Sequence, residues 1–66
     1  MNKFKVGDKV IIRDFEYWGV KGVITDIVMV EDRFLRYEVS VPYLNFNGEI
    51  DTQYYTYPEN ELELRK

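Results

Sequence analysis

Apolar side chains recur at every second position along much of this chain, and that spacing restricts its fold more than any other feature. Residues 34–41 read FLRYEVSV, in which one face of an extended strand is formed by Leu35, Tyr37, Val39 and Val41. No stretch of useful length repeats apolar residues at helical spacing, and the residues that recur are β-branched or aromatic. The pattern predicts an all-β protein.

Turn signals divide the chain into five short strands. Gly7-Asp8 leads into the first, residues 31–33 form a tip, and Asn47-Gly48 is a strong hairpin signal because both residues tolerate positive φ. Residues 58–61 fit one 3₁₀ turn, since a proline at its start presets φ and lacks a donor that the turn would leave unused. The expected strands are 9–14, 22–30, 34–41, 52–57 and a short last strand with Leu62 and Leu64.

Two irregularities shape the expected sheet. Ile24 and Ile27 are three positions apart, so both reach the core only if a β-bulge lies between them. Pro42 has no N–H and therefore ends the third strand or marks a sheet edge. We expect residues 1–66 to form one five-stranded SH3-like barrel with the 3₁₀ turn before its last strand, because closure removes exposed edges.

The chain contains no cysteine and no histidine. Disulfides, thiolate nucleophiles and the commonest general base and metal ligand are therefore excluded. The single serine, Ser40, has no base to activate it, and the carboxylates at 31–32 and at Glu49 and Asp51 lack the spacing of a calcium loop. We expect no enzymatic activity, no metal or cofactor, and no small-molecule substrate.

Acidic side chains outnumber basic ones by twelve to nine, which gives a net charge of −3. Residues 1–36 carry +1 and residues 37–66 carry −4, so we expect one side of the protein to be acidic. No apolar run approaches the roughly 20 residues that span a bilayer, and residues 1–9 lack the apolar stretch of a signal peptide. We therefore expect a cytoplasmic protein without membrane contact.

Acidic residues alternate near the end of the sequence, at Glu59, Glu61 and Glu63. One interpretation is a strand edge that charge keeps soluble. The other is an acidic face that binds a basic partner.

Aromatic side chains are in excess. Eleven are more than so small a core can hold, because each buries about 150 to 250 Å². Four fall on inward phases: Phe4, Tyr37, Tyr55 and Tyr57. Five lie in loops or on the opposite phase and are predicted to contact a partner: Tyr17, Trp18, Tyr43, Phe46 and Tyr54. For Trp18 an equal alternative is a plug at one end of the barrel.

The motif YWGVKGVITDI, residues 17–27, resembles the KOW element of SH3-like barrels, in which an aromatic residue is followed by two glycines and two aliphatic residues. The matching residues are Tyr17, Gly19, Gly22, Ile24 and Ile27. This resemblance implies binding of RNA or single-stranded DNA, with a base stacked on Tyr17 or Trp18. The phosphate contacts would then be Lys9, Arg13, Lys21 and Arg36. The net charge of −3 argues against this function.

The chain also resembles subunit IV of photosystem I and its relatives in ferredoxin:thioredoxin reductase. The similar motifs are Gly7-Asp8-Lys9-Val10, Tyr17-Trp18, Asn45-Phe46-Asn47-Gly48 and Asn60-Glu61-Leu62. This second resemblance implies a structural or docking subunit of an electron-transfer complex. Small phage and prophage proteins are similar as well.

The surplus aromatic residues and the acidic second half favour a non-catalytic interaction module that binds a larger protein or protein complex. A particular form is a phage-type inhibitor that competes with DNA for a basic groove. The alternatives are the RNA or single-stranded DNA binder and, with less support, the electron-transfer subunit.

Overall fold

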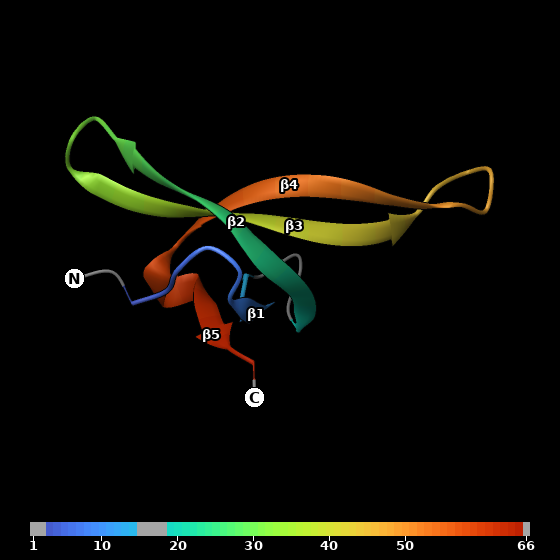
Figure 1. Ribbon diagram of the computed structural model, residues 1–66, viewed down its shortest axis with the longest axis horizontal. Helices are drawn as coiled ribbons and strands as arrows, with labels where there is room; N and C mark the ends of the chain where they lie inside the picture. Colours follow the sequence, from blue (N-terminus) through green and yellow to red (C-terminus); the bar gives the residue numbers. More distant parts are fainter. Residues whose placement is uncertain (1–2, 15–18, 66) are drawn as a thin grey trace.

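Five antiparallel strands form a single sheet in the computed structural model, which describes residues 3–14 and 19–65 (Figure 1). The elements are β1 (Lys9–Ile12), β2 (Val20–Val30), β3 (Phe34–Leu44), β4 (Ile50–Pro58), the 3₁₀ turn η1 (Glu59–Glu61) and β5 (Leu62–Leu64). The all-β class, the five strands and the 3₁₀ turn before the last strand are confirmed. Within the described residues, no helix has the length and apolar character needed to cross a membrane.

The β-bulge expected in the second strand is present. The register between β2 and β3 shifts between Ile24 and Asp26, as a bulge requires. Ile24 is buried and Ile27, half-buried, packs against the core. Both isoleucines therefore face inward despite their odd spacing.

The third strand continues past Pro42. β2 pairs with β3 only as far as Val23 opposite Ser40, whereas β4 follows β3 to Ile50 opposite Leu44. Pro42 thus lies where one side of β3 has no partner strand, and a missing N–H is tolerated there. This position supports the interpretation of Pro42 as an edge residue.

The sheet does not close into a barrel, so that part of the fold prediction is corrected. Its strand order is β4-β3-β2-β1-β5, and in the part of the chain that the structure describes β4 and β5 are not paired. β5 has three residues, all paired with β1, and the first half of β4 runs beside β3 away from the body (Figure 1). The two edges are instead joined by η1 and by side-chain packing of Tyr57 and Leu62 in one core.

Among the described residues, nine buried side chains from all five strands and the N-terminal segment form the core: Phe4, Val10, Ile12, Ile24, Tyr37, Val39, Val41, Tyr57 and Leu62. Tyr37 is fully buried at its centre. The Phe4 ring meets the Tyr37 ring edge-on at 5.3 Å, and the Phe4 amide donates to the Tyr37 hydroxyl at 3.4 Å. The inward prediction is confirmed for Phe4, Tyr37 and Tyr57, while Tyr55 is half-buried against the core.

Candidate functional site

A two-stranded arm projects from the sheet (Figure 1). It consists of residues 41–53, in which the end of β3 and the start of β4 pair with each other around a short loop. The β2 strand has already left β3 at Ser40, so no third strand of the described residues covers either edge of the arm. Apart from Val41, which is part of the core, and the half-buried Asn45, the side chains of the arm are exposed.

The loop at the end of the arm is organised by Asn45. Its side-chain Oδ1 accepts hydrogen bonds from the amides of Asn47 and Glu49, both at 2.9 Å. Its own amide donates to the Glu49 carbonyl at 2.9 Å, and its carbonyl accepts from the Gly48 amide at 3.1 Å. Gly48 has a φ of 79°, which glycine adopts without strain. The predicted hairpin turn is confirmed, although only Gly48 of the Asn47-Gly48 pair has positive φ.

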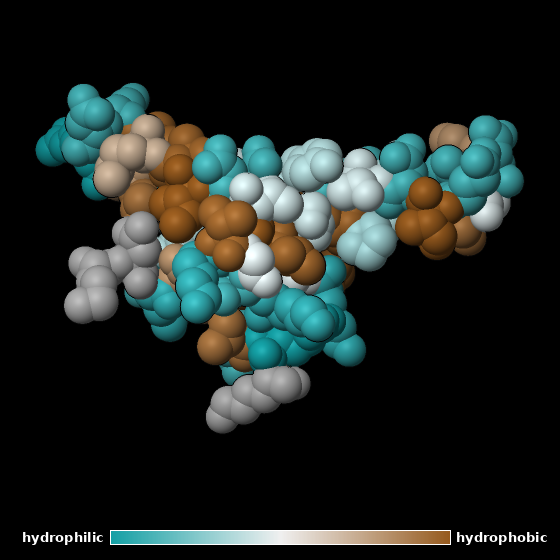
Figure 2. Space-filling view, viewed as in Figure 1, coloured by the Kyte–Doolittle hydropathy of each residue, from teal (hydrophilic) through white to brown (hydrophobic). Residues whose placement is uncertain are grey.

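Four exposed apolar side chains, which we call the arm-tip patch, surround this loop: Tyr43, Leu44, Phe46 and Ile50. Phe46 is fully exposed, and Leu44 and Ile50, a cross-strand pair, are 66% and 74% exposed. Tyr43 points to the opposite face of the ribbon, because successive strand residues alternate, and its hydroxyl donates to Asp51 at 3.3 Å. On the face seen in Figure 2, hydrophobic residues lie at the end of the arm beside hydrophilic ones.

The structure brings together two of the aromatic residues predicted to bind a partner. Tyr43 and Phe46 line one shallow hollow of about 410 Å³, together with Leu44, Asn45 and Gln53. Tyr54 is 61% exposed but lies elsewhere, on the face that carries its cross-strand neighbour Ser40.

Tyr17 and Trp18 lie outside the described residues. Whether Trp18 is a plug or a contact residue therefore stays a prediction, and so does its role in stacking on a base.

The acidic residues near the C-terminus do not lie on one strand. Glu59 and Glu61 belong to η1, where Glu59 is exposed and Glu61 half-buried, whereas Glu63 is exposed on β5. Glu63 forms an ion pair with Arg13, and the Glu61 carbonyl accepts the Arg13 amide at 2.7 Å. Of the three carboxylates, Glu63 is thus already neutralised by a cation of this chain.

The basic residues predicted for phosphate contacts fall into two groups. Lys9 and Lys21 are exposed on β1 and β2. Arg13 binds Glu63, and the Arg36 guanidinium donates to the Thr56 carbonyl at 3.1 Å. The structure therefore directs two of these four side chains to acceptors within the protein.

Sequence reasoning missed Leu44 and Ile50, because the third strand was expected to end at Val41 and the fourth to begin at Thr52. The signal that identifies them is their symmetric position around the loop. Two apolar residues that flank a hairpin turn become a cross-strand pair once both strands extend to it.

No protein-family model matches the chain, and neither a curated protein nor a solved structure gives a match. The resemblances to KOW domains, photosystem I subunit IV and phage proteins therefore stay predictions. Among the described residues no group of three or more histidine, cysteine, aspartate or glutamate side chains is arranged to hold a metal ion.

Proposed function

We propose that this protein is a non-catalytic protein-interaction module and that the arm-tip patch is its principal contact surface. The observation that carries the proposal is Phe46, a fully exposed aromatic side chain on a loop whose backbone is held by Asn45. Exposed apolar surface of this kind is unfavourable in water, and contiguous patches of it mark interaction sites.

The loop geometry makes binding less costly. A loop already fixed by hydrogen bonds loses little conformational entropy when a partner covers it, so more of the contact energy appears as affinity. Aromatic residues at the centre of an interface carry a large part of the binding energy, and here Phe46 and Tyr43 occupy that place. The half-buried Asn45 between them supplies the rigid base.

The shape of the arm indicates the shape of its partner. Because apolar side chains surround the tip, a concave apolar cleft would cover more of it than a flat surface. Glu49 and Asp51 flank the tip, so the rim of that cleft would be basic. A larger protein whose apolar groove has a basic rim fits this description, and an inhibitor that occupies such a groove in the cytoplasm is the form of the function that we favour.

Binding of RNA or single-stranded DNA is the second candidate. Lys9 and Lys21 are available on β1 and β2, which supports it. Arg13 and Arg36 already have internal acceptors, and the net charge is −3, so fewer cations remain than phosphate binding normally uses.

The protein-interaction function is tested by affinity capture from the cells that naturally make the protein. Phe46→Ala should lower recovery of the main partner about tenfold, because it removes the central anchor. Phe34→Ala is the matched control, since it removes the same ring from the tip of the β2–β3 hairpin, where Phe34 is 58% exposed. Equal losses from both variants, or no loss from Phe46→Ala, would contradict the proposal.

A further inference from the structure

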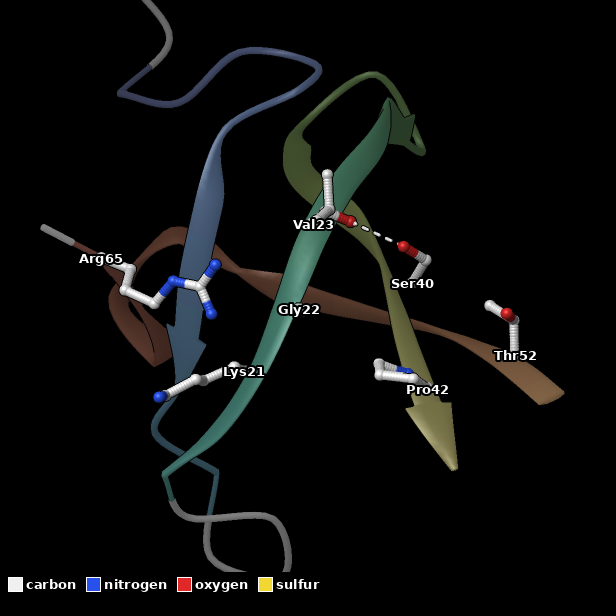
Figure 3. Close-up of a pocket in the computed structure, with 7 residues that line it drawn as sticks. All are labelled: Lys21, Gly22, Val23, Ser40, Pro42, Thr52 and Arg65. Carbon is white, nitrogen blue, oxygen red and sulfur yellow. Dashed lines mark hydrogen bonds between the residues drawn. The ribbon is translucent and has the colours of Figure 1, made fainter. Parts of the chain in front are cut away.

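A second concave surface opens where β2 and β3 separate. The pairing of β2 with β3 begins at Val23 opposite Ser40, and the residues of β2 before Val23 pair with β1 instead, where Lys21 lies opposite Ile11. β3 continues into the arm with β4. The fork between them is a groove of about 510 Å³, lined among others by Lys21, Val23, Ser40, Pro42, Thr52 and Arg65 (Figure 3).

The floor of the groove depends on Gly22. A Cβ placed there would lie 2.4 Å from a methyl group of Val39 and 2.8 Å from the Ser40 carbonyl oxygen. Only glycine lets β2 cross so close to β3 at the point where the strands part. The Ser40 hydroxyl donates to the Val23 carbonyl at 3.3 Å, which ties the two strands together at the fork.

The two sides of the groove differ in charge. Figure 3 shows the Lys21 ammonium and the Arg65 guanidinium on the β1 side, with Ser40, Pro42 and Thr52 on the β3 and β4 side. None of the lining residues that the structure describes is acidic. Within residues 3–14 and 19–65 neither Lys21 nor Arg65 forms an ion pair, and the nearby Glu63 is bound to Arg13. A net-acidic chain thus keeps two cations beside a neutral groove.

We propose that this groove binds an extended acidic segment of a partner protein, with its carboxylates on Lys21 and Arg65 and its backbone along the hydroxyl-bearing wall. In an extended segment alternate side chains share one face, which fits a groove with one cationic and one neutral side. Within residues 3–14 and 19–65 the groove and the arm-tip hollow have no lining residue in common, so the inference goes beyond the proposed function and does not depend on it.

A nucleic acid suits the groove less well than an acidic peptide. Single-stranded nucleic acids are held by a cationic groove that follows the backbone and by aromatic rings on which the bases stack. Among the described residues, the groove is lined by two cations and by no aromatic ring. A peptide with few carboxylates matches two cations without repelling the acidic remainder of the chain.

Recognition through side chains fits this site better than addition of a strand. Pro42 lies on the part of β3 that β2 leaves uncovered, and it interrupts the row of backbone donors that an added strand would need. The affinity should therefore come mainly from charge, and it should fall as the salt concentration rises.

The test uses fluorescence anisotropy with the full chain at low salt. The probes are a labelled peptide that alternates Glu with Ala, the same peptide with Gln in place of Glu, and oligo(dT) of matching length. We expect the Glu peptide to bind and the Gln peptide not to. A double variant that combines Lys21→Glu with Arg65→Glu should bind the Glu peptide with a Kd about tenfold higher or more.

The matched control is Lys5→Glu with Arg33→Glu, which changes the net charge equally at exposed residues that do not line the groove. It should keep the Kd within about twofold, as should Phe46→Ala, because neither change touches the groove. In the wild-type protein the peptide should shift the amide resonances of Val23, Ser40 and Thr52, a result that does not depend on any variant folding. Absent or equal binding of the two peptides, tighter binding of oligo(dT), or an equal loss in the control would overturn the inference.

Discussion

The two hairpins that share β3 both expose apolar side chains at their tips, but they turn the chain in different ways. In the β2–β3 hairpin Glu31 and Asp32 occupy the turn with φ values of 56° and 55°, and the Arg33 amide donates to the Val30 carbonyl at 3.1 Å. Neither residue is glycine, so this turn is strained. In the arm, Gly48 takes the positive φ and the Asn45 side chain holds the loop.

The two turns therefore differ in how firmly they hold the exposed apolar side chains next to them. The β2–β3 turn has positive φ at Glu31 and Asp32, which non-glycine residues rarely adopt. The exposed apolar side chains beside it are Met29, Val30 and Phe34. Phe46 lies on a loop in which glycine takes the positive φ and the Asn45 side chain binds the amides of Asn47 and Glu49. A rigid, unstrained loop is the better platform for binding, and this is why we assign the partner to the arm.

The largest expected effect tests whether the two hairpins fold as one unit. Tyr37→Ala removes the fully buried ring at the centre of β3 and should lower the free energy of unfolding by about 3 to 5 kcal/mol. Urea denaturation measures the loss. Tyr37→Phe, which keeps the ring and removes only the hydroxyl that accepts from Phe4, should cost about 1 kcal/mol. If hydrogen exchange in Tyr37→Ala shows one hairpin intact and the other open, the hairpins do not depend on a common core.

A smaller effect is expected from loosening the arm loop alone. Asn45→Ala deletes the acceptor used by the Asn47 and Glu49 amides and should destabilise the protein by about 1 to 2 kcal/mol. Hydrogen exchange should accelerate at Asn47 and Glu49 and stay unchanged at Arg33. Asn45→Asp keeps an acceptor oxygen and should retain most of the protection. Unchanged exchange in Asn45→Ala would mean that the side chain does not hold the loop.

Relieving the strain in the turn of the β2–β3 hairpin should stabilise the protein. Glu31→Asn combined with Asp32→Gly places at these two turn positions the residues that tolerate positive φ best, and it should raise the free energy of unfolding by about 1 kcal/mol. Thermal denaturation followed by circular dichroism measures the gain. A loss of stability would show that the wild-type turn is not strained.

The smallest effects concern the exposed rings themselves. Phe34→Ala and Phe46→Ala should each change the free energy of unfolding by less than about 0.5 kcal/mol, because both residues are exposed in the folded state, Phe46 fully and Phe34 to 58%. The same urea titration compares them. Surface substitutions usually change the free energy of unfolding by no more than about 0.5 kcal/mol. A loss above about 1 kcal/mol for Phe46→Ala would therefore indicate that Phe46 packs within the protein instead of binding a partner.

Local sequence signals predicted much of this fold. The alternation around Tyr37 and Val39 gave the core face of β3, the odd spacing of Ile24 and Ile27 gave the bulge, and Pro58 marked the start of the 3₁₀ turn. Each of these depends on residues close in sequence. The alternation rule works here because one face of the sheet is buried and the other is not.

Features that depend on distant pairing were not predictable in the same way. Whether the edges β4 and β5 meet is decided by the lengths and bends of several strands together, so barrel closure was wrongly expected. The ion pair of Arg13 with Glu63 follows from the register of β1 and β5, which places Ile11 opposite Glu63. The arm was also missed in part, because a proline normally suggests the end of a strand and here β4 supports the strand beyond Pro42.

The central claim is that the arm tip, and not the other hairpin tip, is the surface that a partner covers. The most direct measurement places a photoreactive phenylalanine analogue at position 46 or at position 34 and irradiates the cells that make the protein. We predict one dominant crosslinked protein from position 46, lost when Leu44 and Ile50 are changed to Ser, and none from position 34. A crosslink from position 34 alone, or none from position 46, would contradict the account.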